Sequence, residues 1–293
     1  MEVWLSKRSF SHWLYVVPAL VILAFFLVYP AVHTIILSLG DKTGEGFAGF
    51  SNYRFVFTNR TMQSALRNNL LWVVVFTAGT VGLGLAMAVL LDRVKYERIA
   101  KAIIFLPMAV SFVGSGVIWK FVYSFRPATV AQTGLLNGIV VALGGQPIGW
   151  LIERPWINNF ALIFVGVWIW TGFCMVVLSA TYKGIPKSLL ESARLDGATE
   201  WQVFWRITFP LMRSTIAVAA TMMLITVLKI FDIVYVMTNG NYGTEVIANR
   251  MYKEMFQFKN FGRASAIAVV LLLAIIPVMI FNLKKFREQE AIR

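Results

Sequence analysis

The chain has 293 residues, of which 58% are apolar and only 14% are charged, and its mean hydropathy is +0.71. Soluble domains average about 45–50% apolar and about 25% charged residues, so this composition excludes an ordinary soluble protein and indicates an integral membrane protein. We attribute the net charge of +13 to topogenic residues and contacts with anionic lipid rather than to nucleic acid binding. The lone Cys174 excludes an intramolecular disulfide.

Six apolar runs are long enough to cross the hydrocarbon core, which needs about 20 residues of helix. They predict spans at about 13–39, 69–91, 102–125, 159–181, 212–238 and 264–283. The first run is too long for a signal-peptide core and contains Pro18 and Pro30, so we expect it to be retained. The expected fold is an all-α integral membrane protein, with residues 1–293 forming a single transmembrane domain.

The distribution of Lys and Arg favours a cytoplasmic location for both termini, because the segments on that side of six spans are shorter and hold more of these residues. Residues 134–152 carry no charge and offer a seventh span as an alternative. Asn137, Gln146 and Pro147 interrupt this run, and each polar group left unpaired in hydrocarbon costs several kcal/mol. We therefore expect a short amphipathic helix and a turn on the outer surface there.

A polar cytoplasmic loop, residues 182–211, separates the fourth and fifth predicted spans and contains two helix starts. Pro186 ends the preceding helix, and Ser188 with Glu191 forms a Ser-x-x-Glu capping box that begins a short helix. Gly197 suits the left-handed residue just past the C-terminus of that helix. The local pattern predicts a helix followed by a glycine turn.

The second helix of this loop begins with Thr199 and Gln202, which repeat the capping pattern as Thr-x-x-Gln. Pro210 is expected to bend or end this helix before the fifth span. Its apolar positions hold Trp201, Phe204, Trp205 and Ile207.

The first helix of the loop has the composition of a docking element. Small side chains let a partner approach closely and the leucines supply apolar contact, as in helix-in-groove recognition. The alternative is an interfacial helix lying on lipid, but such helices usually carry Lys and Arg along the polar face. Here the polar positions are Glu191, Arg194, Asp196 and Glu200, so protein docking is favoured.

The loop resembles the EAA motif of ABC-transporter permease subunits, which reads E-A-A, three residues, G, nine residues, I-x-L-P. This chain has Glu191-Ser192-Ala193, three residues, Gly197, nine residues, and ITFP at 207–210. It departs from the motif at Ser192 and Phe209, which keep small size and apolarity. Further segments are similar to the carbohydrate-importer branch, as in the first permease of a maltose or α-glucoside pair, over about residues 13–285: PALVILAFFLVYPAVHTIILSL, FSNYRFVF, FLPMAVSFVGSGVIWKFVY and FDIVYVMTNG.

This resemblance implies a type I ABC importer permease with no ATPase site of its own. The sequence lacks GxxxxGK[ST], the loop that would hold ATP phosphates, so ATP and Mg would be used by two partner ATPase subunits and this chain would bind no cofactor and be no enzyme. The family's coupling contacts then fall on Glu191, Ser192, Ala193, Arg194, Asp196, Gly197, Ile207 and Pro210.

The resemblance also implies further partners in a bacterial or archaeal cell membrane. A second homologous permease would complete the pathway, and an extracytoplasmic solute-binding protein would meet the outer loops at 40–67, 126–158 and 239–263. The segment NGNYGTE, residues 239–245, departs from the Gly-Gly-Gly-Pro usual in the family. The expected solute is a sugar, such as an α-glucoside or a glucosylated compatible solute.

Two charges in the fifth predicted span are candidates for the solute pathway. Lys229 and Asp232 stand three residues apart, which places them on one face of a helix, and isolated charges near the bilayer centre each cost about 2.5–3.5 kcal/mol. They could instead pair with each other or snorkel to the surface. Aromatic and hydroxyl side chains of the fourth span suit sugar rings, although tryptophans also form interfacial belts. The expected pathway residues are Trp170, Phe173, Thr226, Lys229, Ile230 and Asp232.

An alternative is a self-contained secondary transporter that uses Lys229 and Asp232 as an ion site. This alternative leaves the doubly capped loop unexplained, and the inverted repeats that such transporters usually contain are not evident. The two histidines stand far apart with no carboxylate beside either, so no metal site is predicted.

Overall fold

The computed structural model describes residues 15–92, 94–153 and 156–290. The described residues form helices joined by turns and loops, with one isolated bridge between Gly40 and Phe47. They fall into two compact units, which we describe separately. The first comprises the described residues up to Asn59 together with Met251–Leu272, and the second comprises Arg60–Arg250 with the described residues from Leu273 onward. The predicted start of the first span, at residues 13 and 14, lies outside the described residues.

The first unit is built on a helical span from Tyr15 to Ser38. Pro30 does not interrupt it, because a π-turn lies directly upstream and the Tyr29 N–H donates to the Ala24 carbonyl. A proline cannot donate to the helix ladder and its ring crowds the preceding turn, so a locally wider turn accommodates it. The named elements of this unit are η1 (Ala24–Val28), α2 (Tyr29–Ser38), α3 (Ser51–Thr58), η5 (Lys253–Gln257) and the first part of α14 (Phe261–Glu290).

The loop between α2 and α3 is fixed by side-chain hydrogen bonds. Asn52 Nδ2 donates to the carbonyls of Ser38 and Gly40, at 2.9 and 2.7 Å. Asp41 Oδ1 accepts from the hydroxyl of Thr43 at 2.8 Å and from the backbone N–H of Gly44 at 2.9 Å. The Thr43 hydroxyl bond, helped by backbone N–H groups, holds the pKa of Asp41 below its ordinary value.

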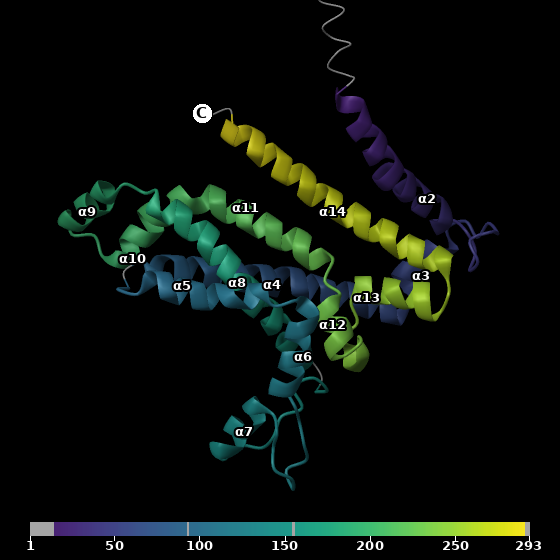
Figure 1. Cartoon of the computed structure of the whole chain (residues 1–293), viewed down its shortest axis with the longest axis horizontal. Coiled ribbons are helices and arrows are strands. Elements are labelled where there is room, and N and C mark those ends of the chain that lie inside the picture. Colours follow the sequence, from purple (N-terminus) through teal and green to yellow (C-terminus); the bar gives the residue numbers. More distant parts are fainter. Residues whose placement is uncertain (1–14, 93, 154–155, 291–293) are drawn as a thin grey trace, which may run out of the picture. The chain divides into compact units, whose positions relative to one another are not determined.

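The second unit contains the two segments to which the sequence assigned functions. Helices α4, α8 and α11 contact one another and run side by side, while α9 and α10 lie at one end of this group and α12 lies towards the other (Figure 1). The elements in chain order are α4 (Arg60–Leu91), α5 (Glu97–Phe105), η2 (Leu106–Ala109), α6 (Phe112–Val122), α7 (Leu135–Ala142), α8 (Ile157–Lys183), α9 (Lys187–Leu195), α10 (Glu200–Val203), η3 (Phe204–Thr208), α11 (Phe209–Leu228), α12 (Asp232–Met237), η4 (Asn241–Gly243) and the start of α13 (Ile247–Tyr252).

Glycines allow α4 and α5 to approach α8 at backbone distance. A Cβ at Gly84 of α4 would stand 2.5 Å from the Cβ of Cys174, and a Cβ at Gly172 of α8 would stand 2.6 Å from the Cα of Phe105. Both distances are too short for carbon atoms, so neither position accepts a side chain without movement of a helix. Small residues at helix contacts are the usual means of close packing in membranes.

Five helices in the described part of the chain are long and apolar enough to cross a membrane: Tyr15–Ser38, Arg60–Leu91, Ile157–Lys183, Glu200–Leu228 and Phe261–Ile280. A bent pair, Glu97–Ala109 with Phe112–Val122, meets at 102° and makes a sixth if it is counted as one span. The predicted span over 102–125 falls on this pair, which is not one continuous helix. Pro107 is the second residue of a 3-10 turn that begins at Leu106, and Val110 after this turn is extended. Ser111 caps a new helix by accepting from the Gly114 N–H at 3.1 Å.

Residues 134–152 form a short helix and a turn, as predicted, and not a seventh span. Helix α7 ends at Ala142, and Asn137 within it is fully buried. Its amide nitrogen donates to the carbonyls of Ser124 and Ile148, and its oxygen accepts from the N–H of Ile148 and from the Trp150 indole. The polar residue that argued against a span thus organises the turn.

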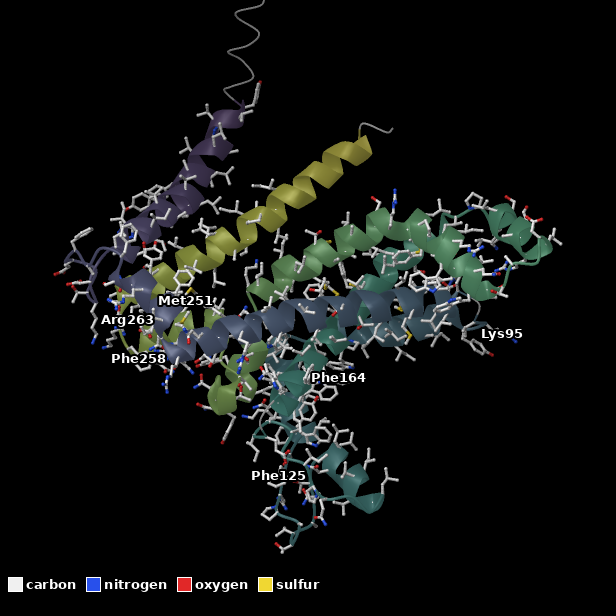
Figure 2. All side chains as sticks on the ribbon, turned by 180° about the vertical axis from the view of Figure 1, so that it is seen from behind. Lys95, Phe125, Phe164, Met251, Phe258 and Arg263 are labelled. Atoms are coloured by element: carbon white, nitrogen blue, oxygen red, sulfur yellow. The ribbon has the colours of Figure 1, made fainter. Side chains whose placement is uncertain are left out.

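Large apolar side chains remain exposed along the helices of the second unit. Phe164, on α8, is 51% exposed, and Phe125 lies just beyond α6 (Figure 2). Exposed apolar surface of this extent is expected on helices whose solvent is lipid.

Candidate functional site

The first candidate site is the helix–glycine–helix joint, residues 187–203. Its first helix, α9, begins at Lys187 after Pro186, and no side chain caps it. The predicted Ser188–Glu191 capping box is therefore wrong. Because Pro186 itself occupies the capping position and its carbonyl accepts from the Leu189 N–H at 3.1 Å, Ser188 lies inside the first turn.

The glycine turn of the joint has the geometry that the sequence predicts. Gly197 has a φ of +82°, the left-handed region that favours glycine. The N–H of Ala198 donates to the carbonyl of Ala193 at 3.0 Å, and the N–H of Gly197 donates to the carbonyl of Arg194 at 3.1 Å. These two bonds are the Schellman pattern, which satisfies the last carbonyls of α9 and fixes the direction in which the chain leaves it.

The second helix of the joint starts at the predicted capping box. The Gln202 N–H donates to Thr199 Oγ1 at 3.3 Å, and the Thr199 N–H donates to Gln202 Oε1 at 2.8 Å. Pro210 does not end this helix, which continues from Glu200 to Leu228. A π-turn over Phe204–Thr208 lies directly upstream of the proline, the same arrangement as at Pro30.

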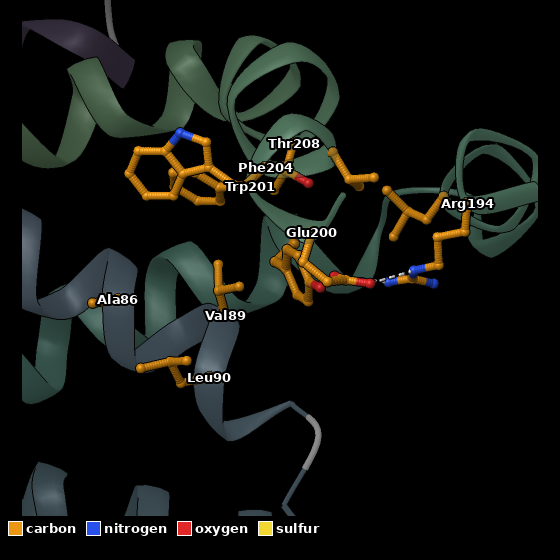
Figure 3. A pocket seen from close by; sticks show the side chains of 11 residues that line it. Ala86, Val89, Leu90, Arg194, Glu200, Trp201, Phe204 and Thr208 are labelled. Carbon is orange, nitrogen blue, oxygen red and sulfur yellow. Dashed lines mark hydrogen bonds and ion pairs between the residues drawn. The ribbon is translucent and has the colours of Figure 1, made fainter. Parts of the chain in front are cut away.

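An ion pair ties the two helices of the joint together. Arg194 Nε lies 2.7 Å from Glu200 Oε1, and the pair borders an apolar cavity of about 350 Å³ beneath the joint (Figure 3). Ala86, Val89 and Leu90 of α4 line the opposite wall of this cavity. The joint is thus internally tied but is not packed tightly against α4.

The residues predicted for coupling lie in the first helix and the glycine turn of the joint and in the helical segment that follows it. Glu191, Ser192, Arg194, Asp196, Gly197 and Pro210 are exposed, whereas Ala193 and Ile207 are half-buried against the core. Leu195 is 88% exposed and Trp201 is 71% exposed. An apolar and charged surface of this kind, held by a rigid turn, is suited to docking another protein.

A charged cluster that the sequence reasoning missed joins α5 to the end of α8, next to the joint. Glu97 Oε1 lies 2.5 Å from Lys101 Nζ and 2.6 Å from Lys183 Nζ. Lys101 also bonds the Ser179 hydroxyl, and Lys183 stands 3.9 Å from Asp92. The spacing of Glu97 and Lys101 by four residues was the one local signal, because the contact with α8 crosses a long stretch of chain.

The second candidate site is a break in the predicted fifth span. Helix α11 ends at Leu228 and α12 begins at Asp232, so Lys229 and Asp232 do not share one helical face, and that prediction is wrong. The N–H groups of Lys229 and Ile230 close the end of α11, and Phe231 has a non-helical φ of −140°. Asp232 stands in the first turn of α12, where the helix dipole favours an anionic group.

A small pocket of about 50 Å³ lies at this break. It brings together five of the six predicted pathway residues, namely Trp170, Thr226, Lys229, Ile230 and Asp232. The sixth, Phe173, is outside it but its ring meets that of Trp170 edge-on, at 5.6 Å between centroids. The described contacts include no ion pair between Lys229 and Asp232.

Three further aromatic residues line the pocket and were not predicted. They are Phe76 of α4, Phe112 of α6 and Phe231 in the break itself. The rings of Phe112 and Trp170 stack at 6.1 Å. Because these residues come from four parts of the chain, only the folded arrangement of α4, α6, α8 and the break identifies them. The pocket combines aromatic faces with one cationic and one anionic side chain.

Comparison with known proteins identifies a family and two extensive likenesses. The profile of the family described as "binding-protein-dependent transport system inner membrane component" matches residues 80–284. The osmoprotective compounds uptake permease protein GgtC of Synechocystis sp. is 59% identical over 280 residues, covering 96% of this chain and 100% of that protein. The alpha-glucoside transport system permease protein AglF of Rhizobium meliloti is 47% identical over 278 residues, covering 94% of this chain and 82% of that protein.

Among solved structures, the crystal structure of a bacterial ABC transporter involved in the import of the acidic polysaccharide alginate contains a similar chain. The TM-score is 0.81 with 23% identity, and the match covers 98% of this chain and 99% of that chain. At this identity the likeness shows the fold alone. It confirms the predicted all-α importer-permease fold, while the side of the membrane on which the termini lie stays a prediction.

Proposed function

The chain belongs to the family of binding-protein-dependent transport system inner membrane components, and from this premise we propose that it forms half of the translocation pathway of an ATP-driven importer. In this proposal the joint at 187–203 docks on a separate ATPase subunit. The pocket at the break between α11 and α12 contacts the solute. A second, homologous permease completes the pathway.

The observation that carries the coupling proposal is the construction of the joint. A Schellman turn at Gly197, a capping box at Thr199 and the Arg194–Glu200 ion pair define its shape, while Leu195 remains almost fully exposed. A rigid, exposed apolar surface transmits a push better than a mobile loop. Closure of two ATPase subunits on ATP and Mg would shift the joint as a rigid body and so open the pathway alternately to each side.

The solute we propose is a neutral, polyhydroxylated molecule of the sugar class, such as an α-glucoside or a glucosylated compatible solute. Two relatives with extensive identity are described as permeases for osmoprotective compounds and for alpha-glucosides. The pocket at the helix break offers aromatic faces for sugar rings and the charges of Lys229 and Asp232 for hydroxyl groups. An extracytoplasmic binding protein would deliver the solute to the outer loops.

The alternative, a self-contained transporter that uses Lys229 and Asp232 as an ion site, has no support among the relatives, which are described as transport-system permease proteins. The family of the chain also names dependence on a binding protein.

The proposal is tested by reconstituting this chain in lipid nanodiscs with the permease, ATPase and binding-protein subunits encoded beside it. We expect ATP hydrolysis that rises several-fold when binding protein loaded with the glucoside or related solute is added. The same assembly in vesicles should accumulate that solute when ATP is supplied on the ATPase side. Uptake by this chain alone, driven by an ion gradient without ATP, would refute the proposal.

A further inference from the structure

The segment at 238–247, which contains the unusual NGNYGTE, has a constrained backbone. Asn239 and Tyr242 have φ values of 51° and 57°, and Gly240 and Gly243 between and beside them have 70° and 79°. Glycine adopts this region freely, whereas a tyrosine with positive φ is strained and persists only where its surroundings hold it. Such strain often marks a residue whose position serves a function.

Buried amides from two helices hold this segment in place. Asn68 Nδ2 of α4 donates to the carbonyls of Gly243 and Glu245, at 2.7 and 2.8 Å. Asn158 Nδ2 of α8 donates to the carbonyl of Tyr242 at 2.8 Å. Because α4 and α8 form the core of the unit, the loop is positioned as rigidly as the helices themselves.

The held loop forms one wall of a cavity of about 350 Å³, which lies within the range of about 300–1,000 Å³ typical of small-molecule sites. The start of α4 also lines this cavity, with Arg60, Thr61 and Ser64. The loop contributes Tyr242, which is 47% exposed, and Glu245, which is buried. The Glu245 carboxylate is oriented by Asn249 Nδ2, at 2.5 Å.

The chemistry of this lining fits a neutral molecule with several hydroxyl groups. The Tyr242 ring offers an apolar face, Arg60 offers a planar set of donors, and Glu245 offers an acceptor. The Glu245 carboxylate would repel an anion, and the Arg60 guanidinium would repel a simple cation. Hydroxyl groups, which both donate and accept, are compatible with both side chains.

We propose that this cavity is a second solute subsite, separate from the pocket at the helix break, which receives a sugar-like solute before it enters the pathway. The inference rests on the proposed function. Helix α12, six residues or about 9 Å long, connects the two sites, since it begins at the break and ends just before the held loop. The solute would pass from one to the other along this short helix.

The test is direct binding of methyl α-glucoside to the assembled complex in nanodiscs without its binding protein, measured by saturation-transfer difference NMR. We expect a signal with the wild type that falls at least threefold in Arg60→Gln and in Tyr242→Asn. Asparagine tolerates positive φ, so the second variant removes the ring without adding strain. Arg54→Gln, which removes a similar charge from α3, is the matched control and should keep the full signal.

Two results would overturn the subsite: an absent signal in the wild type, or a full signal in both cavity variants. In the second case, equal weakening of the affinity for loaded and for unloaded binding protein in both variants would show that the cavity is a protein contact. Either result would leave ATP hydrolysis stimulated by loaded binding protein intact in the wild type, so failure of the subsite is distinguishable from failure of the importer proposal.

Discussion

Arg194 and Glu200 form an ion pair across the Gly197 turn, with 2.7 Å between Nε and Oε1. The pair joins the last turn of α9 to the first residue of α10, so it fixes the angle between the two helices of the joint. Both side chains are partly exposed, and ion pairs at the surface contribute only about 0–1 kcal/mol to stability. We therefore expect the main role of this ion pair to be fixing the angle between α9 and α10, and not adding to stability.

From this we predict that Glu200→Arg reduces solute uptake per ATP hydrolysed, while the thermal unfolding midpoint changes by no more than a few degrees. The reversed pair, Arg194→Glu with Glu200→Arg, should recover part of the uptake, because the attraction is restored with opposite polarity. Parallel assays of uptake and hydrolysis on reconstituted vesicles measure the ratio. An unchanged ratio in the single variant would show that the pair does not set the joint.

Substitution of Gly197 by proline should uncouple hydrolysis from uptake while the spans remain inserted. Proline has no N–H to donate to the Arg194 carbonyl and cannot take the φ of +82° found here. The control is Gly82→Ala in α4, where a Cβ meets nothing within 4 Å. Protease accessibility of the loops verifies insertion, and normal coupled uptake in Gly197→Pro would contradict the role of the turn.

Glu97→Gln should weaken the attachment of α5 to α8. The carboxylate serves two lysines at once, and hydrogen bonds to charged groups contribute about 1.5–3 kcal/mol when buried, so we expect a loss of about 1 kcal/mol at this half-buried site. Thermal unfolding of the purified complex measures the loss. Glu45→Gln, at an exposed carboxylate in the loop before α3, should leave the midpoint unchanged. Equal midpoints for the two variants would argue against a structural role for the cluster.

Asp232→Asn should lower uptake by about tenfold or more without preventing assembly with the ATPase subunits. A hydrogen bond from a hydroxyl group to a charged acceptor is worth about 1.5–3 kcal/mol, and the amide retains the shape but not the charge. Uptake as a function of solute concentration and co-purification of subunits are the two measurements. Asp92→Asn is the matched control, because it makes the same substitution outside the pocket, at a carboxylate 3.9 Å from Lys183 Nζ. Failure of Asp232→Asn to assemble would make this charge structural.

Local chemistry made the joint largely predictable from the sequence. The Thr199–Gln202 box and the left-handed Gly197 depend on residues within a few positions of each other, and both are confirmed. The Ser188–Glu191 box had the same sequence signature, but the nearby Pro186 took the capping position first. A motif alone does not reveal this competition between neighbouring residues.

Hydropathy located the spans but not their interruptions. The bend after Pro107 and the break at Lys229 both lie inside runs whose mean hydropathy is high enough to predict one span each. Their positions depend on backbone caps and on packing against other helices, and neither contributes to hydropathy. For the same reason the sequence did not indicate that Phe76 and Phe112 line the pocket at the break, because both residues lie outside the fifth predicted span.

The π-turn at Phe204–Thr208 has a consequence for how the joint and the fifth span are oriented to each other. A π-turn holds about one residue more than an α-turn, and one residue of α-helix corresponds to a rotation of about 100°. The π-turn absorbs this extra residue, so removing a single residue between Trp201 and Pro210 would restore a regular helix without turning the joint around the axis of α11. If all the residues were kept and the turn became a regular α-helix, the joint would turn by about 100°. The π-turn therefore sets the rotational phase at which a movement of the joint reaches the span.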